Sequence, residues 1–305
     1  MGRYPKPLFI PLDLLQSDEL AQRLVLNLRL PRLITAMLLG MSLSAAGGVM
    51  QMLFRNPLVE PGFLGVTQGA GFGAALSILW LSTSPFVIEI SATLFAVLGL
   101  GMSYFIARRI RFGGWVLRLV LSGIAVSALF SAGLGILKYM ADPATKLPEI
   151  VFWLMGGLWS VEWQDLLYIL PVVLVGLIII FLMRWRLNLL SLSDETAFSL
   201  GVSVGRERSL LLAASVAITA VVVSVAGIVG WIGLIVPHIT RRITSANAAE
   251  FIPVSMSLGA VFAIVCDDLA RVLTVGEIPL GIITSLIGAS LFLVMMTSKK
   301  IRISQ

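Results

Sequence analysis

The chain has 305 residues, of which 58% are hydrophobic and 12% are charged, and its mean hydropathy is +1.00. A water-exposed domain usually carries about 25% charged residues, so this composition excludes an ordinary soluble protein and indicates that most of the surface faces lipid. The net charge of +6 does not indicate nucleic-acid binding, because the basic residues fall at the ends of apolar segments.

The apolar segments predict a helical membrane protein. A helix that crosses the hydrocarbon layer needs about 20 mostly apolar residues. Strong segments of this kind are residues 33–54, 86–107, 116–137, 166–183, 210–229 and 282–296. Weaker or broken ones are residues 63–81, 231–239 and 252–270. We therefore expect an all-α, polytopic transmembrane helical bundle with about nine spans.

The amino-terminal end differs from the rest of the chain. Residues 1–27 contain one short apolar piece, residues 8–15, which Pro11 and Asp13 interrupt, and no cleavable signal peptide is predicted. We interpret residues 1–27 as an N-terminal segment and residues 28–305 as a single transmembrane domain.

The basic residues indicate the orientation of the bundle. When the loops are assigned to alternate sides, one side receives Arg55, Arg108, Arg109, Arg111, Arg118, Arg184, Arg186, Arg206, Arg208, Arg241, Arg242, Lys299, Lys300 and Arg302. The opposite loops keep Lys138, Lys146 and Arg271. Cytoplasmic loops carry the excess of Lys and Arg, so the carboxyl terminus is predicted to be cytoplasmic.

The longest polar connection, residues 187–208, lies on the basic side. Within it, Ser193 is a predicted N-cap, and Asp194, Glu195 and Thr196 follow in the first turn, where acidic groups complement the positive helix end. Gly201 is a plausible helix stop. A short amphipathic helix is expected here, with apolar contacts offered by Ala197, Phe198 and Leu200. The alternative is a solvated connector.

Two further motifs have ordinary structural explanations. Gly69, Gly71 and Gly73 resemble a dinucleotide loop only superficially, because they open an apolar span, and small residues that permit close helix packing explain them better. Asp267 and Asp268 are spaced to pair with Arg271 across one helical turn. Local pairing and a docking role stay open as alternatives for this group.

The sequence predicts no catalytic, cofactor or metal site. The single histidine, His238, has no Cys, His or carboxylate cluster at ligand spacing, and a serine triad would need the same histidine. No Walker A sequence occurs. Enzymatic activity is therefore not expected, and any energy from ATP must come from a partner.

Four segments carry a family resemblance. They are Leu-Arg-Leu-Pro-Arg at residues 28–32, Ala-Gly-Gly-Val-Met-Gln at 46–51 continuing to Arg-Asn-Pro-Leu-Val-Glu-Pro-Gly-Phe-Leu-Gly at 55–65, Gly-Trp-Ile-Gly-Leu-Ile-Val-Pro-His-Ile at 230–239, and Glu-Ile-Pro-Leu-Gly-Ile-Ile-Thr at 277–284. In this order and spacing the chain resembles the FecCD/BtuC-type permeases of type II ABC importers, which serve iron-siderophore, haem and cobalamin uptake. The resemblance covers nearly the whole chain.

The resemblance implies an assembly and a set of site residues. It implies a homodimer of permeases, two cytoplasmic ABC ATPase subunits and an extracytoplasmic substrate-binding protein. Arg29, Arg32 and Arg271 match the arginines that meet acidic residues of the binding protein. Residues 193–201 match the helix that couples to the ATPase, with Ser193, Asp194, Glu195, Thr196, Ala197, Leu200 and Gly201 as its residues. Asn56 and Leu58 match positions near the inner gate, and residues 118–137 match the helix that lines the pathway.

One departure concerns the amino terminus. Members of the family have ten spans, the first of which precedes the Leu-Arg-Leu-Pro-Arg segment. Residues 1–27 are then the remnant of a missing first span, or the true start lies upstream. The permease domain itself is expected to occupy residues 28–305.

The function expected from these observations is import of a metal chelate, such as an iron-siderophore or haem, across a bacterial or archaeal cytoplasmic membrane by alternating access. A cobalamin or molybdate-type substrate is the alternative within the family. An ion-coupled secondary transporter is a second class, disfavoured because mid-span carboxylates are scarce. A membrane enzyme is disfavoured by the missing catalytic clusters.

Overall fold

Residues 18–297 are described by the computed structural model, and their regular structure is helical throughout. The long helices, in chain order, are α3 (Leu30–Leu53), α5 (Pro85–Arg109), α6 (Trp115–Met140), α8 (Trp163–Leu182), α11 (Val204–Ala226), α13 (Ala248–Val272) and α14 (Leu280–Thr297). The shorter ones are α2 (Glu19–Leu24), η1 (Val25–Arg29), η2 (Pro61–Leu64), α4 (Val66–Leu76), η3 (Ser77–Leu81), α7 (Lys146–Met155), α9 (Arg184–Leu190), α10 (Asp194–Ser199) and α12 (Ile232–Ile243).

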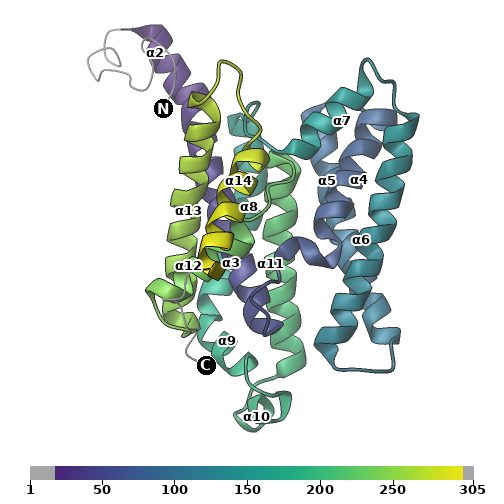
Figure 1. The fold of residues 1–305 in the computed structure, drawn as a ribbon, viewed down its shortest axis with the longest axis vertical. Helices are drawn as coiled ribbons and strands as arrows, with labels where there is room; N and C mark the ends of the chain where they lie inside the picture. The colour runs from purple at the N-terminus through teal and green to yellow at the C-terminus, as the bar shows by residue number, and fades with distance from the viewer. Residues whose placement is uncertain (1–17, 298–305) are drawn as a thin grey trace.

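The helices form two groups that meet at α11 (Figure 1). In one group, α3 packs against α8, α12 and α13, while in the other α5 packs against α4 and α6; α11 contacts both α3 and α5. The small helices α9 and α10 lie at one end of the bundle, and α2 and α7 lie at the other (Figure 1). The long helices therefore run between two ends that carry different connections.

The predicted polytopic helical fold is confirmed. Seven helices within residues 18–297 are long and apolar enough to cross a membrane, and residues 66–81 form a shorter apolar helix. Each of the nine apolar segments overlaps a helix, but the segment at residues 231–239 corresponds to α12, which has only 12 residues. The count of about nine spans is thus an approximation, since α12 is too short to cross the bilayer by itself.

The first described span extends further toward the amino terminus than its apolar core. Asp18 caps α2, and its Oδ1 accepts a hydrogen bond from the backbone N–H of Leu20 at 2.9 Å. The helix then continues through η1 into α3, so that residues 19–53 form one candidate span. The division between residues 27 and 28 falls inside this helix. The remainder of the N-terminal segment, residues 1–17, lies outside the described residues, as do Lys299, Lys300 and Arg302.

Small residues permit close approach between helices, as the glycine pattern predicted. A Cβ at Gly69 would overlap the backbone of Phe95, and a Cβ at Gly73 would overlap that of Ser91, so these glycines set the distance between α4 and α5. The Ser91 hydroxyl also donates to the carbonyl oxygen of Gly73 at 2.7 Å. Gly40 makes the same kind of contact with α13. Backbone proximity of this type is the usual way in which helices associate in lipid.

A buried ion cluster joins the start of α3 to the end of α13. The guanidinium of Arg32 donates through Nε and Nη2 to Asp267, at 2.8 Å for the shortest contact, and through Nη1 to both oxygens of Glu277. Arg271 also pairs with Asp267, at 3.2 Å, and with Asp268. Local pairing, one of the two alternatives for Arg271, thus occurs in the structure, whereas the contribution of Arg32 connects residues 235 positions apart.

Loss of Arg32 should destabilise the fold. The side chain of Asp267 is only 3% exposed, so Arg32→Leu would leave this buried carboxylate with Arg271 alone, and breaking a buried pair typically costs about 3–5 kcal/mol. We expect a clearly lower Tm in detergent for Arg32→Leu. Arg23→Leu is the matched control, because Arg23 is 70% exposed and its ion pair with Glu19 lies on the surface, where such a pair is worth about 1 kcal/mol or less. Equal Tm values for the two variants would contradict this interpretation.

Candidate functional site

A cavity of about 840 Å³ is lined by residues from several segments that lie far apart in the sequence. The segment that follows α3 contributes Glu60 and Phe63, and the connection from α11 to α12 contributes Ile228 and Trp231. Gly230 comes from the same connection, and the other lining residues come from the end of α7, the start of α12 and from α14; they are Leu154, Met155, Leu234, Gly281, Ile282, Ser285 and Leu286. Such a volume lies within the range of small-molecule sites.

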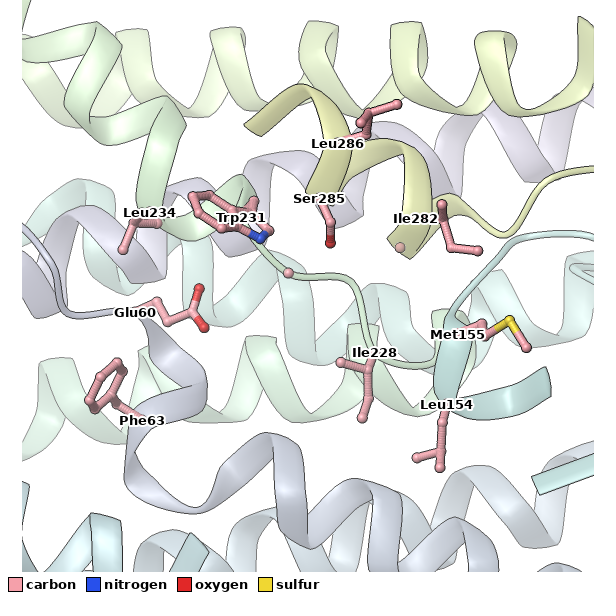
Figure 2. Close-up of a pocket in the computed structure, with 12 residues that line it drawn as sticks. Glu60, Phe63, Leu154, Met155, Ile228, Trp231, Leu234, Ile282, Ser285 and Leu286 are labelled. Atoms are coloured by element: carbon pink, nitrogen blue, oxygen red, sulfur yellow. The ribbon is translucent and has the colours of Figure 1, made fainter. Parts of the chain in front are cut away.

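The walls of this cavity are mostly apolar, and Glu60 is the single ionisable side chain among its described lining residues. Its side chain points toward Trp231 (Figure 2). The backbone N–H of Trp231 donates a hydrogen bond to this carboxylate. The cavity therefore suits a large ligand with a mainly apolar surface.

Trp231 holds an unusual backbone conformation at the start of α12. Its φ is +71°, in the left-handed region that non-glycine residues rarely adopt. Its side chain packs on α14, where a Cβ at Gly288 would overlap it and the ring of Phe292 lies 6.1 Å away between centroids. Tight packing on α14 thus holds Trp231 where its N–H reaches Glu60.

A second hollow of about 380 Å³ adjoins the first and shares Glu60, Phe63 and Ile228 with it. Here α6 contributes Ile124 and Ser127, which belong to the helix that the family resemblance matches to the pathway lining.

Asn56 and Leu58 lie in the turn that leads from α3 toward the cavity. The side-chain oxygen of Asn56 accepts a hydrogen bond from the backbone N–H of Leu58 at 2.9 Å, and Leu58 is 48% exposed. Neither residue lines the two hollows. Glu60 and Phe63, which do line them, were not selected from the sequence, although both lie in the same quoted segment and Glu60 is a rare carboxylate between apolar spans.

The predicted short helix at residues 193–201 is confirmed as α10. The Ser193 hydroxyl accepts a hydrogen bond from the backbone N–H of Thr196 at 3.2 Å, and Gly201 ends the segment with a φ of +79°. Ala197 is buried, but Phe198 is 76% exposed and Leu200 is 55% exposed. The helix lies at the end of the bundle, next to α9 (Figure 1).

A polar hollow of about 310 Å³ lies where α3 begins and α13 ends. Arg29, Arg32 and Arg271 line it together with Glu277. The structure thus brings the three selected arginines together. However, the side chain of Arg32 is only 10% exposed and that of Arg271 only 14%, because both take part in the ion cluster.

Comparison with known proteins gives consistent matches over most of the chain. Residues 5–298 match the FecCD transport family. The molybdate import system permease protein MolB of Haemophilus influenzae is 39% identical over 91% of this chain and 82% of its own length. A probable iron chelatin transport system permease protein of Helicobacter pylori is 40% identical over 92% of this chain and 84% of its own.

A solved structure supports the same conclusion. It is described as an inward-facing conformation of a metal-chelate type ABC transporter, and it is 38% identical to this chain with a TM-score of 0.89, over 96% of this chain and 92% of its own. Sequence motifs, helix arrangement and comparisons therefore agree that the chain is a multi-pass membrane protein and belongs to the FecCD transport family, the permease subunits of ABC importers.

Proposed function

We propose that this permease imports a metal chelate, such as an iron-siderophore or haem, into the cytoplasm and that separate ATPase subunits supply the energy. The observation that carries the proposal is α10, a capped helix at one end of the bundle that exposes Phe198 and Leu200 to solvent. Exposed aromatic and aliphatic side chains on a small protruding helix are typical anchors for a partner protein. No Walker A sequence is present in the chain, so the nucleotide must be bound by that partner.

The ends of the bundle differ in charge, and this supports an orientation. The helix ends near α10 carry several arginines, namely Arg108 and Arg109 at the end of α5, Arg184 and Arg186 in α9, and Arg206 at the start of α11. Because cytoplasmic loops are rich in Arg and Lys, α10 and the carboxyl terminus would lie in the cytoplasm of a bacterial or archaeal cell, and the arginine-lined hollow would face outward.

The cavity that contains Glu60 supports the proposal of a homodimer. A concave surface that contains the carboxylate of Glu60 would be costly to expose to hydrocarbon. A second copy placed over α6 and α14 would cover this surface and convert it into a central pathway, with Asn56 and Leu58 near its inner end. Motion of α10 would then open the pathway to alternate sides, as the resemblance implies for residues 193–201.

At the outer end, Arg29, Arg32 and Arg271 would guide an acidic surface of a substrate-binding protein, because guanidinium groups pair well with carboxylates and charge complementarity sets register and association rate. Charge reversal at Arg32 or Arg271 would also break the ion cluster that these residues form with Asp267, Asp268 and Glu277, so we place the docking test at Arg29, which lines the same hollow.

A second candidate substrate is molybdate, favoured by the 39% identity with the molybdate permease. The described lining residues of the larger cavity include no Arg or Lys that would hold an oxyanion, so we favour the chelate. Cobalamin remains a substrate of the same kind. An ion-coupled secondary transporter would instead show uptake without ATP.

Phe198→Asp should weaken association with the ATPase, because a charge would replace an aromatic anchor, and such anchors contribute about 2 kcal/mol or more. Phe112→Asp is the matched control, since Phe112 is 66% exposed in the α5–α6 connection. Affinity is measured on detergent-solubilised permease with the purified ATPase. Equal binding by Phe198→Asp and the native chain would rule out α10 as the ATPase contact.

Arg29→Glu should slow association with the binding protein by more than about tenfold, because a carboxylate would then face carboxylates, and like-charge contacts across an interface cost several kcal/mol. Arg23→Glu makes the same change in charge two turns earlier, at a side chain that is 70% exposed, and should have a smaller effect. Surface plasmon resonance at two salt concentrations measures both rates. An unaffected association rate for Arg29→Glu would refute the docking assignment.

Leu286→Cys should cross-link to a second copy in membranes, because Leu286 is 66% exposed at the mouth of the larger cavity. The native cysteine should not react with the cross-linking reagent, since the one cysteine of the chain, Cys266, is buried. Leu167→Cys is the control, because Leu167 is 62% exposed on α8. Cross-linking with a bifunctional thiol reagent is read as a dimer band on a gel. Equal dimer yields at the two positions would contradict the proposed interface.

A further inference from the structure

A buried arginine lies directly behind α10 and contacts two other elements. The side chain of Arg208, in the first turns of α11, is only 7% exposed. Its Nη2 donates to Oδ1 of Asp194 at 2.7 Å, and its Nη1 donates to Oδ2 at 3.3 Å. Asp194 is the first residue of α10. The two-pronged contact therefore fixes the orientation of α10 relative to α11.

The flat face of the same guanidinium contacts α6. The Cζ atom of Arg208 is 4.5 Å from the centre of the Trp115 ring, well within the range of a cation–π contact. Trp115 is the first residue of α6, and its ring lies 5.5 Å from the ring of Phe54, between centroids. Phe54 is buried and caps the C-terminal end of α3.

This series of contacts, from Asp194 through Arg208 and Trp115 to Phe54, ends at the turn that leads toward the cavity. Phe54 is followed by Arg55, whose φ of +49° reverses the chain toward Asn56 and Glu60. A second contact joins this turn directly to the segment before α10, since Nη2 of Arg55 donates to the carbonyl oxygen of Leu192, two residues before α10 begins. The turn at residues 55–60 is thus held to the α10 region on two sides.

The energetics argue that stability is not the main role of Arg208. Desolvating an arginine is costly, and a buried ion pair is often no more stable than apolar residues of similar volume. The partner, Asp194, is 59% exposed, so the pair gains little from a low dielectric. The hydrogen bonds from Arg208 nevertheless hold the pKa of Asp194 below its ordinary value, so Asp194 stays ionised and the contact persists at neutral pH.

We propose that Arg208 is the positioning residue that transmits displacement of α10 to the cavity, through its two-pronged contact with Asp194 and its stacking on Trp115. This rests on the proposed function, in which α10 receives the ATPase. Only a planar guanidinium can bind a carboxylate with two N–H groups and stack on an aromatic ring at the same time. A displaced α10 therefore moves Trp115 and Phe54, and with them the turn at residues 55–60.

The test uses the assembled transporter in liposomes, with ATP hydrolysis and uptake measured on the same preparation. Arg208→Lys keeps the charge but loses the fork and the stacking. We expect it to bind the ATPase normally and hydrolyse ATP, while uptake per ATP falls about tenfold, within the range typical of coupling between sites. Arg206→Lys is the matched control, an exposed arginine on the same helix, and should leave uptake per ATP unchanged.

Trp115→Leu is the second variant, because it keeps an apolar residue and removes the ring face. It should lower uptake per ATP as Arg208→Lys does, and the double variant should be no worse than either one, since both changes interrupt the same contact. A parallel loss of Tm, ATPase binding and hydrolysis in both variants would show a merely structural role and overturn the proposal. Native uptake per ATP in Arg208→Lys would overturn it as well.

The proposed function fails in a different way. If the native permease does not bind the ATPase, or if Phe198→Asp binds it as tightly as the native chain does, α10 is not the coupling element. If both of those results hold as expected and Arg208→Lys still transports normally, the coupling element stands and only the role of Arg208 is refuted.

Discussion

The absence of hydrogen-bonding solvent in the hydrocarbon layer is the constraint on which this structure depends. Each backbone N–H and C=O group within the membrane must find a partner in the protein, and helices meet this requirement within one segment. Ionisable groups are subject to the same constraint. Where the chain has to place charge inside the bundle, as at Arg32 and Asp267, it surrounds that charge with partners.

The same constraint bears on the cavity that contains Glu60. An apolar surface on a membrane protein would ordinarily be covered by lipid, but a hollow that contains Glu60 and the polar end of Ser285 is poorly suited to acyl chains. The proposed pathway between two copies would explain why this surface is concave and why irregular backbone at Trp231 and at residues 55–60 occurs beside it. Irregular backbone at membrane depth is tolerated where protein or a water-filled cavity surrounds it.

Much of the fold was predictable from the sequence, because its causes are local. Apolar length predicts the spans, the glycines at 69 and 73 predict close packing, and the Ser193 cap with Gly201 predicts α10. The pairing of Arg271 with Asp267 follows from helix spacing. Contacts of Arg32 and Arg208 with distant elements, and the entry of Glu60 into a cavity, depend on tertiary packing that no local pattern encodes. Family resemblance pointed to Arg29, Arg32 and Arg271, but only the structure shows that the three line one hollow.

In the proposed function, this chain moves its substrate only when a separate ATPase acts on it from the α10 end. The most direct measurement is uptake into liposomes that contain the purified permease, with the ATPase subunits and ATP either supplied or omitted. The cognate binding protein would be loaded in turn with ferric hydroxamate, haemin and molybdate. We expect uptake of an iron chelate or haemin that requires both the ATPase and ATP. Uptake at the same rate without the ATPase would contradict it.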